Sequence, residues 1–180
     1  MKRQIIDCCA LLNLYTGWGS LQPLLSFELS LYVAKAVIEE SLYINEWDSN
    51  QEKVKVPIDL RSIREDSNLT VVAPQTIAEI DDYIDFAMEI DDGEAQSLSI
   101  AKHRNLVLLT DDRKALALAR RTDVSVETLT TVEILQEWGG TSIEHAQSLP
   151  TILRRITELA RFTPRGGTPE RIWWDGLIER

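Results

Sequence analysis

Apolar and polar positions along the first 140 residues predict short strands that are each followed by a helix. The apolar run "RQIID" predicts a buried strand that ends at Asp7, and "CALLNLY" has helical spacing up to the breaker "TGWGS". The same order recurs where "LVLLT" runs into "DRKALALARR". Repeated strand–helix units predict an α/β fold, a three-layer α/β/α sandwich around a mostly parallel sheet.

The segments between these units are less regular. Residues 23–31 and the segment "YVAKAVIEESLYI" are expected to be helical, whereas the polar residues 45–57 are expected to form a loop. "NLTVVAP" predicts a strand that ends at Pro74, and "VSVET" predicts a short late strand. The central sheet is therefore expected to take its strands from both halves of the chain.

Further helices are indicated by periodicity and by capping signals. One helix is expected to begin after Gly93, and "TTVEILQEW" has Thr130 and Glu133 at the spacing of a capping box. The helix "TIAEIDDYIDFAMEI" is expected to have a solvated acidic face and an opposite apolar face. The acidic face comprises Asp81, Asp82 and Asp85, and the apolar face comprises Ile77, Ile80, Ile84 and Met88.

Residues 141–180 have a different pattern and are predicted to be a helical, aromatic extension of a domain formed by residues 1–140. They contain a predicted helix, "TILRRITELARF", a turn, "TPRGGTP", and the final segment "ERIWWDGLIER". Large aromatic side chains are usually buried, so the extension is expected to pack on its own domain or on a second copy of the chain. A partner-binding surface is the alternative.

Composition narrows the class of protein. The chain has 180 residues, 44% of them hydrophobic and 27% charged, which is typical of a soluble globular domain. No signal peptide and no apolar run of transmembrane length is recognised. The two cysteines, Cys8 and Cys9, are adjacent, which suits neither an ordinary disulfide nor a zinc site, so a reducing, cytoplasmic setting is expected.

The net charge of −10 argues against broad nucleic-acid binding by a basic face, so such a function would need a metal or a partner.

Acidic residues follow the predicted strands or open the helices beside them. Asp7 and the pair Asp111 and Asp112 follow strands, and Glu94 opens a helix. Glu39 or Glu40 can reach the same edge, because the carboxyl ends of parallel strands gather functional groups. Clustered carboxylates repel one another unless a cation neutralises them, so an Mg²⁺ or Mn²⁺ site is the economical explanation.

Each acid also has a structural interpretation. Asp112 can cap the following helix, and Glu94 in the first turn can interact favourably with the helix dipole. Glu39 or Glu40 can be solvated helix residues. Asp7 resists such an interpretation, since it lies between apolar "II" and "CCALL", where an unpaired carboxylate is unfavourable.

Four ordered motifs in residues 1–140 resemble those of PIN-domain nucleases. They are "IIDCCALLNLY", "AVIEES", "DDGEAQSLSIAKHRNLVLLTDDRKALALA" and "VETLTTVEIL". The resemblance implies metal-binding, catalytic roles for Asp7, Glu40, Glu94 and Asp112, with Glu39 and Asp111 as alternates. It also implies supporting polar roles for Asn13 and Thr110. The "D-x-GEA" form of the third motif resembles the branch with glutamate at this position, whereas cysteines follow Asp7 where a small hydroxyl residue is common.

The resemblance implies an Mg²⁺- or Mn²⁺-dependent endoribonuclease. The nearest cations by sequence for a phosphate are Arg104, Arg113 and Lys114. Many PIN proteins of this size are toxins of toxin–antitoxin pairs, which implies RNA as substrate and a small antitoxin-like protein as partner. Two alternatives stay open: a PIN-fold interaction module with little or no catalysis, and a receiver-like or phosphatase-like domain that binds Mg²⁺ at its strand ends.

Overall fold

The computed structural model describes residues 3–25, 30–40, 43–58 and 69–179. The helices are α1 (Cys8–Trp18), α2 (Gln22–Leu25), α3 (Lys35–Glu39), α5 (Ile77–Phe86), α6 (Asp92–Arg104), α7 (Arg113–Ala119), α8 (Thr131–Gly139), α9 (Ile143–Arg155), the π-helical turn η1 (Ile156–Ala160) and α10 (Pro169–Ile178). The strands are β1 (Arg3–Ile6), β2 (Ser30–Ala34), β3 (Tyr43–Trp47), β4 (Lys53–Pro57), β5 (Thr70–Val72), β6 (Val107–Leu109) and β7 (Thr128–Leu129). None of the helices within those ranges has the length and apolar character needed to span a bilayer.

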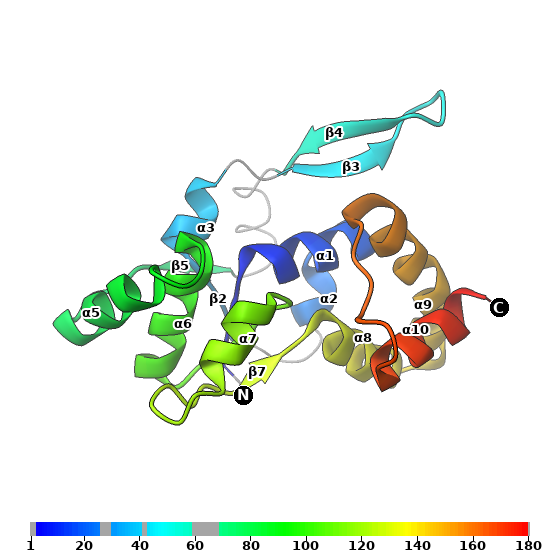
Figure 1. Cartoon of the computed structure of the whole chain (residues 1–180). Coiled ribbons are helices and arrows are strands. Elements are labelled where there is room, and N and C mark those ends of the chain that lie inside the picture. Colours follow the sequence, from blue (N-terminus) through cyan, green and yellow to red (C-terminus); the bar gives the residue numbers. More distant parts are fainter. Residues whose placement is uncertain (1–2, 26–29, 41–42, 59–68, 180) are drawn as a thin grey trace.

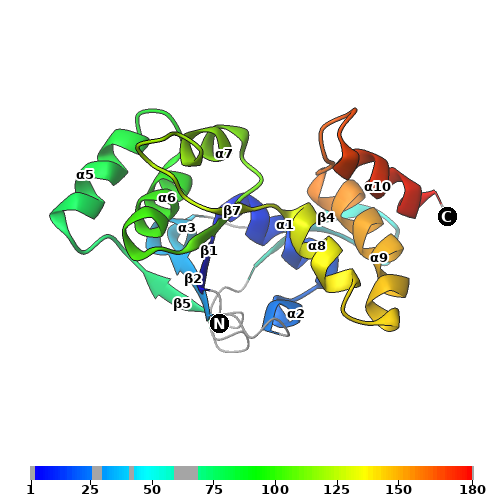
Figure 2. The same ribbon diagram turned by 90° about the horizontal axis from the view of Figure 1, so that it is seen from below.

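A parallel five-stranded sheet is the centre of the fold. Its strand order is β5-β2-β1-β6-β7, and each neighbouring pair runs parallel. Helices α5 and α6 lie on one side of this sheet, and α1, α8 and α9 lie on the other (Figures 1 and 2). The predicted three-layer α/β/α sandwich is therefore confirmed. When only the strands of this sheet are numbered in chain order, the strand order is 3-2-1-4-5. Receiver domains have the order 2-1-3-4-5, so the fold is not that of a receiver domain.

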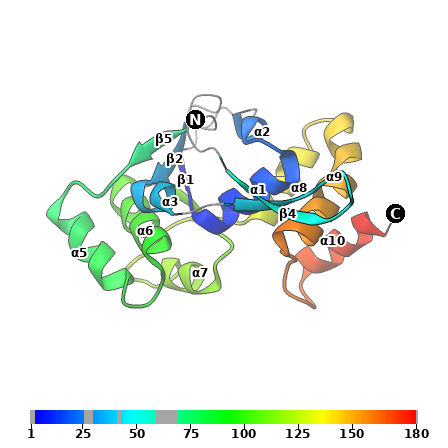
Figure 3. The same ribbon diagram turned by 90° about the horizontal axis from the view of Figure 1, so that it is seen from above.

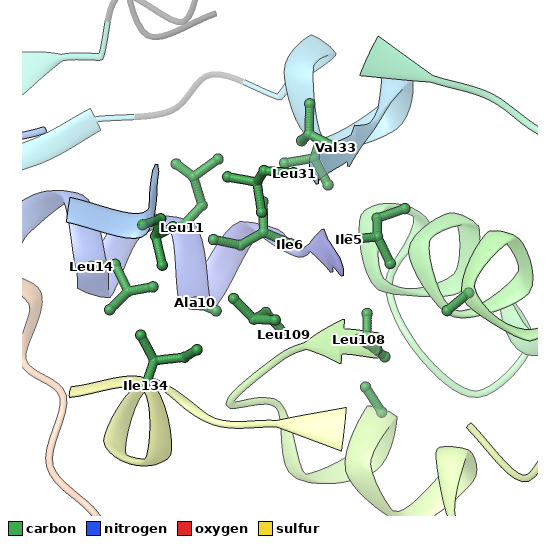
Figure 4. Close-up of a cluster of buried hydrophobic side chains, with 14 of the residues drawn as sticks. Ile5, Ile6, Ala10, Leu11, Leu14, Leu31, Val33, Leu108, Leu109 and Ile134 are labelled. Atoms are coloured by element: carbon green, nitrogen blue, oxygen red, sulfur yellow. The ribbon is translucent and has the colours of Figure 1, made fainter. Parts of the chain in front are cut away.

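Strand β1 lies in the middle of the sheet and is buried on both faces. Ile5 and Ile6 are fully buried, as expected for a central parallel strand covered by helices on both sides. Successive side chains point to opposite faces, so Ile6 lies toward Ala10 and Leu11 of α1 while Ile5 points to the other helical layer (Figure 4). The core therefore continues through the sheet and fixes the position of β1, the strand that leads into Asp7.

The chain between α1 and β5 differs from its prediction. The predicted helix over "YVAKAVIEESLYI" is limited to α3, because its first residues belong to β2 and its last belong to β3. The predicted loop at residues 45–57 is largely an antiparallel hairpin, β3 paired with β4. In the segment 23–31 the described helix is α2, while β2 takes up its end and residues 26–29 lie outside the described ranges. The alternating "KVKVP" was the strand signal, masked by the polar composition around it.

Helix α5 forms where the periodicity predicts it, and Asp81 and Asp85 are exposed as predicted, but the predicted apolar face is not the inner one. Its predicted apolar face is exposed, with Ile77 79% and Met88 82% accessible. The inner face instead carries Glu79 and Phe86, both buried. Glu79 closes the capping box with Thr76 and pairs with Arg104 of α6 (Nε–Oε1 2.7 Å). Asp82, predicted to be solvated, pairs with Lys102 at 2.8 Å. These polar contacts hold the helix with its apolar stripe facing the solvent.

The described part of the C-terminal extension packs on the preceding domain. Helix α9 begins at Ile143, ahead of the predicted helix, and continues into η1. Both pack against α1, and α9 also packs against α8. Trp174 is fully buried, donates its indole N–H to Thr157 Oγ1 (3.0 Å) and contacts Phe162 and Trp173 edge-on. The late strand is also shifted: it is Thr128–Leu129 rather than "VSVET".

Gly17 of α1 lies where η1 and α9 come closest. A Cβ at this position would be 2.8 Å from Ile156 Cδ1 and 2.9 Å from Ile152 Cγ2, whereas a Cβ on Gly176 of α10 would meet nothing within 4 Å. Alanine stabilises a free helical position over glycine by roughly 0.5–1 kcal/mol, but overpacking costs about 1–3 kcal/mol. We therefore expect Gly17→Ala to lower the free energy of unfolding in urea and Gly176→Ala to leave it equal or higher. Equal gains in both variants would show that α1 and η1 are not in contact.

Candidate functional site

The register of the parallel sheet brings two acidic segments together at its carboxyl edge. Ile6 of β1 pairs with Leu109 of β6, and the Asp7 amide donates to the Leu109 carbonyl at 3.0 Å. The Thr110 amide in turn donates to the carbonyl of Leu129 at the end of β7 (3.0 Å). Asp7, Thr110 and the acids that follow Thr110 are therefore neighbours, although about a hundred residues of chain separate them.

Asp7 is a fully buried carboxylate at the beginning of α1. It is the N-cap of this helix and accepts from the Ala10 amide (2.9 Å) and from the Cys9 thiol (3.2 Å to each carboxylate oxygen). Burial raises the pKa of Asp7 to about 7, although hydrogen bonds from Thr110, Ala10 and Cys9 act in the opposite direction. The surrounding protein thus provides hydrogen-bond donors to the carboxylate, but burial outweighs them and disfavours its ionised form.

Asp111 and Asp112, which are adjacent in sequence, have different partners. Asp111 accepts from the Asn13 amide group (2.8 Å), the Thr131 amide (2.9 Å) and the Thr131 hydroxyl, so it links α1 and α8 to the end of β6. Asp112 caps α7 through Oδ1, which accepts from the Ala115 amide at 2.8 Å. Asp112 Oδ2 has no hydrogen-bond donor among the described residues. Both aspartates line the same cleft, but only Asp112 has an oxygen without a donor from the described residues.

Glu40 and Glu94 approach each other because position 93 has no side chain. Glu40 is the exposed C-cap of α3, and Glu94 lies in the first turn of α6. A Cβ on Gly93 would lie 2.5 Å from Glu40 Oε1, so glycine allows the Glu40 carboxylate to rest on the start of α6. Burial raises the pKa of Glu94, and the nearby charges of Asp91, Asp112 and Glu40 raise it further.

The acids border a cleft of about 760 Å³. Glu40, Glu94, Asp111 and Asp112 line it, together with the half-buried Cys8 and Cys9, while Asp7 lies behind Cys9. Burial, together with the adjacent carboxylates, raises the pKa of both thiols, so their S–H groups stay protonated at neutral pH and can donate to Glu40 and Asp7. Carboxylate oxygens are ligands that Mg²⁺ and Mn²⁺ prefer.

The side chains do not form a closed metal site as they stand. Within the ranges that the structure describes, no three His, Cys, Asp or Glu side chains are grouped closely enough to hold one ion. The chemistry of the donors fits a hard divalent cation, since oxygen ligands gather from four segments and their charges disfavour one another. The positions fit less well, because Asp7 is covered by Cys9. Binding an ion would therefore require side-chain rearrangement at Cys9 and Glu40.

Four predicted residues lie away from the cleft or have other partners. Glu39 is exposed and pairs with Lys35 one turn earlier in α3 (3.2 Å). Arg104, predicted as a phosphate contact, is at the C-terminal end of α6, where it binds Glu79 and the Ala73 carbonyl (2.7 Å each). The structure separates Arg104 from the acidic edge, because Glu94 and Arg104 are at opposite ends of one helix. Arg113 and Lys114 are exposed at the start of α7 and do not line the cleft.

The far wall of the cleft contains residues that the sequence pattern did not indicate. It is built from the hairpin and from the end of η1, and its residues include Tyr43, Asn45, Lys55, Leu159, Arg161 and Phe162. Recognition of the β3–β4 hairpin from the alternation in "YINEW" and "KVKVP" would have placed a lysine and a tyrosine side by side. No local signal indicated that this hairpin faces the acidic edge.

A family model described as a PIN domain matches residues 3–138. The chain belongs to the PIN-domain family. The match covers the whole five-stranded sheet and the acidic edge, and PIN domains are generally nucleases that bind divalent metals. Neither the comparison with curated proteins nor that with solved structures gave a match. The C-terminal extension, with η1 and α10, lies beyond the part of the chain that matches the PIN domain.

The buried Asp7 predicts how the stability of the metal-free PIN domain depends on pH. Its pKa is about 7 in the folded protein against an ordinary value of 3.8, so the folded state binds more protons and the free energy of unfolding falls as pH rises from about 4 to about 7. Asp7→Asn removes the charge and keeps an N-cap residue. In EDTA, we expect the free energy of unfolding of this variant to exceed that of the parent by on the order of a few kcal/mol above pH 7. Near pH 4 the two values should be equal.

Urea unfolding between pH 4 and pH 8 measures this difference. Asp7→Ala is the control, because it removes both the charge and the cap and should be about 1 kcal/mol less stable than Asp7→Asn at every pH. A parent whose stability rises relative to Asp7→Asn from pH 4 to pH 7 would mean that strong hydrogen bonds stabilise the charged carboxylate.

Proposed function

We propose that this PIN domain is a divalent-metal-dependent ribonuclease that hydrolyses RNA phosphodiester bonds. The observation that carries the proposal is the gathering of acids from four separate segments around one cleft at the carboxyl edge of the sheet. Asp7, Glu40, Glu94 and Asp112 would hold Mg²⁺ or Mn²⁺. When bound, the ion would supply a water of lowered pKa and would stabilise the charge that develops on the phosphate. RNA as the substrate class rests on the family resemblance.

The chain's own residues support these roles in different ways. Asp112 is oriented by its cap to α7, which leaves one oxygen for a ligand. Asp111, with Asn13 and Thr131, acts as a positioning residue that fixes the loop after β6. Thr110 accepts from the Asp112 amide at 3.0 Å and donates to Asp7, so it ties the two acidic segments together. The loop therefore holds its acids in place before any ligand arrives.

On the grounds of family resemblance, the proposal includes a cytoplasmic location and a protein partner. A small antitoxin-like protein would hold such a ribonuclease inactive in the cell that makes it. A homodimer is the other assembly that the exposed apolar residues of α5 suit, since a contiguous apolar surface favours protein contacts.

A second candidate function is a PIN-fold interaction module without catalysis. Two observations favour it: no three acids are grouped as a ready-made ion site among the described residues, and Ile77, Ile80 and Ile84 of α5 are exposed together with Met88 just after it. Such a module would bind a partner through α5 and would show no metal-dependent cleavage. Metal binding and RNA cleavage therefore need to be measured separately.

Calorimetric titration with Mn²⁺ tests the metal site through matched pairs of neighbouring acids. We expect Glu40→Gln and Asp112→Asn each to weaken Mn²⁺ binding roughly tenfold or more, since even residues behind the ligands have effects of this size. Glu39→Gln should bind like the parent, because Glu39 pairs with Lys35 away from the cleft. Asp111→Asn should lower the urea midpoint more than Asp112→Asn does, because it puts an NH₂ group, which cannot accept, in place of one of the two oxygens that accept from Asn13 and Thr131. Equal Mn²⁺ binding by Glu39→Gln and Glu40→Gln would place the ion elsewhere.

Incubation of the purified protein with a pool of structured and unstructured RNAs tests the reaction. We expect cleavage with Mn²⁺, none with EDTA, and a fall of roughly a hundredfold or more in Asp7→Asn, as is common when one charge-stabilising group is removed from an active site. Activity should fall as salt rises, because salt screens the attraction between RNA and the cations of the cleft. Equal cleavage by the parent and Asp7→Asn identifies a contaminant. No cleavage by either, with Mn²⁺ binding intact, favours the interaction module.

A further inference from the structure

The cleft has two walls of opposite chemistry. The wall formed by the sheet edge carries Glu40, Glu94, Asp111 and Asp112. The opposite wall carries Tyr43 and Lys55 of the hairpin, and Arg161 and Phe162 after η1. A chain of net charge −10 repels a polyanion at long range, so a ribonucleic acid strand needs local cations to stay in this cleft. The basic and aromatic wall is where such cations occur.

The hairpin presents Tyr43 and Lys55 as one unit. In the antiparallel register Asn45 lies opposite Lys55, so Tyr43 and Lys55 are diagonal neighbours on one face. The Lys55 ammonium lies 4.1 Å from the centre of the Tyr43 ring, which is 46% accessible. Within the described part of the chain, neither Lys55 nor Arg161 forms an ion pair. Among these residues no carboxylate competes with a phosphate for either cation.

The hairpin is fixed to the rest of the protein by polar contacts at η1. Asn45 donates to the Leu159 carbonyl (2.8 Å), and Lys53 donates to the Glu158 carbonyl (2.7 Å). Arg155 joins Glu46 of the hairpin (2.8 Å) to the Thr16 carbonyl of α1 (3.0 Å). Figure 3 shows the hairpin extending over α1 toward α9. The basic wall is thus held rigidly relative to α1, the helix that Asp7 caps.

Arg161 takes its position from the end of η1. The π-helical turn closes with Arg161 in the left-handed region (φ 57°), and Phe162 directly follows it into the cleft. Phe162 is in turn fixed by its edge-on contact with the buried Trp174 (5.8 Å between ring centres). The C-terminal extension therefore contributes part of the cleft in addition to covering the domain.

We propose that Tyr43, Lys55 and Arg161 form a binding wall for single-stranded RNA opposite the acidic edge. Lys55 and Arg161 bind phosphates, and the exposed face of Tyr43 stacks on a base. Stacking on aromatic side chains beside a basic groove is the usual physics of single-strand recognition, and a duplex does not offer its base faces. The assignment rests on the proposed ribonuclease function and adds to it the residues that hold the substrate.

The hairpin also supplies a matched control. Trp47 and Lys53 repeat the pair farther along the strands, with the ammonium 4.9 Å from the ring centre and Trp47 42% accessible, but neither lines the cleft. A role that any exposed aromatic on the hairpin could perform would involve Trp47 as much as Tyr43. Arg120, exposed at the end of α7 and outside the cleft, is the matched control for loss of a positive charge.

The test is fluorescence anisotropy with a labelled eight-nucleotide single-stranded RNA and the same RNA as a duplex, both in EDTA. The protein is the full chain with Asp7→Asn, so binding is read without cleavage and without metal. Tyr43→Ser is expected to weaken single-strand binding about tenfold, and Tyr43→Phe to retain it. Lys55→Met and Arg161→Met are each expected to reduce the salt slope of log K by about 0.7, the value for one phosphate contact on a single strand.

Trp47→Ser and Arg120→Met are expected to bind like the Asp7→Asn parent, and the duplex is expected to bind more weakly than the single strand. The binding wall is overturned if the Asp7→Asn parent does not bind the single strand, if Trp47→Ser weakens binding as much as Tyr43→Ser, or if the two cation variants keep the parental salt slope. Failure of the ribonuclease proposal has a different signature. In that case the wild-type protein binds with the same dependence on the wall and cleaves nothing with Mn²⁺.

Discussion

The burial of the Asp7 carboxylate is the constraint on which the site depends. Parallel pairing on both sides of β1 places Asp7 at the centre of the sheet edge, where water does not reach it. A carboxylate there needs donors, and the helix amide of Ala10, the Cys9 thiol and Thr110 provide them. These donors come from the start of α1 and the end of β6, so satisfying one acid fixes the relative position of both segments. Asp111 and Asp112, which follow Thr110 directly, take their positions from this arrangement.

The sequence predicted the sheet and the acids at its edge because both depend on local patterns. Apolar runs mark buried strands, and in a parallel sheet every strand ends at the same edge, so Asp7 and the pair after Thr110 had to be near each other. The different roles of Asp111 and Asp112 could not be predicted in this way. They are set by donors on α1 and α8, namely Asn13 and Thr131, whose approach depends on tertiary packing.

The two largest errors have a common physical origin. Residues 45–57 read as a loop, and the apolar stripe of α5 read as the inner face, because in both segments side-chain polarity does not report burial. The hairpin is exposed along most of its length and is held by polar contacts to η1. Helix α5 is held by the Glu79 and Arg104 pair, which places a carboxylate inside and isoleucines outside. Ion pairs and backbone contacts between distant segments are not encoded in hydrophobic periodicity.

The energetics of the acidic edge favour a bound cation over a purely adhesive role for this cleft. Ionisation of Asp7 opposes folding at neutral pH, and the missing side chain of Gly93 allows Glu40 to approach Glu94, whose pKa the charges of Glu40 and Asp112 raise. A surface that only docks a partner gains nothing from acids whose charges destabilise the free protein. A divalent ion reverses the sign of these interactions, since each carboxylate that repels its neighbours in the free state attracts the ion in the bound state. The proposed basic wall would then solve a separate problem, because it would let an acidic protein hold a polyanion without neutralising the acids that the ion would require.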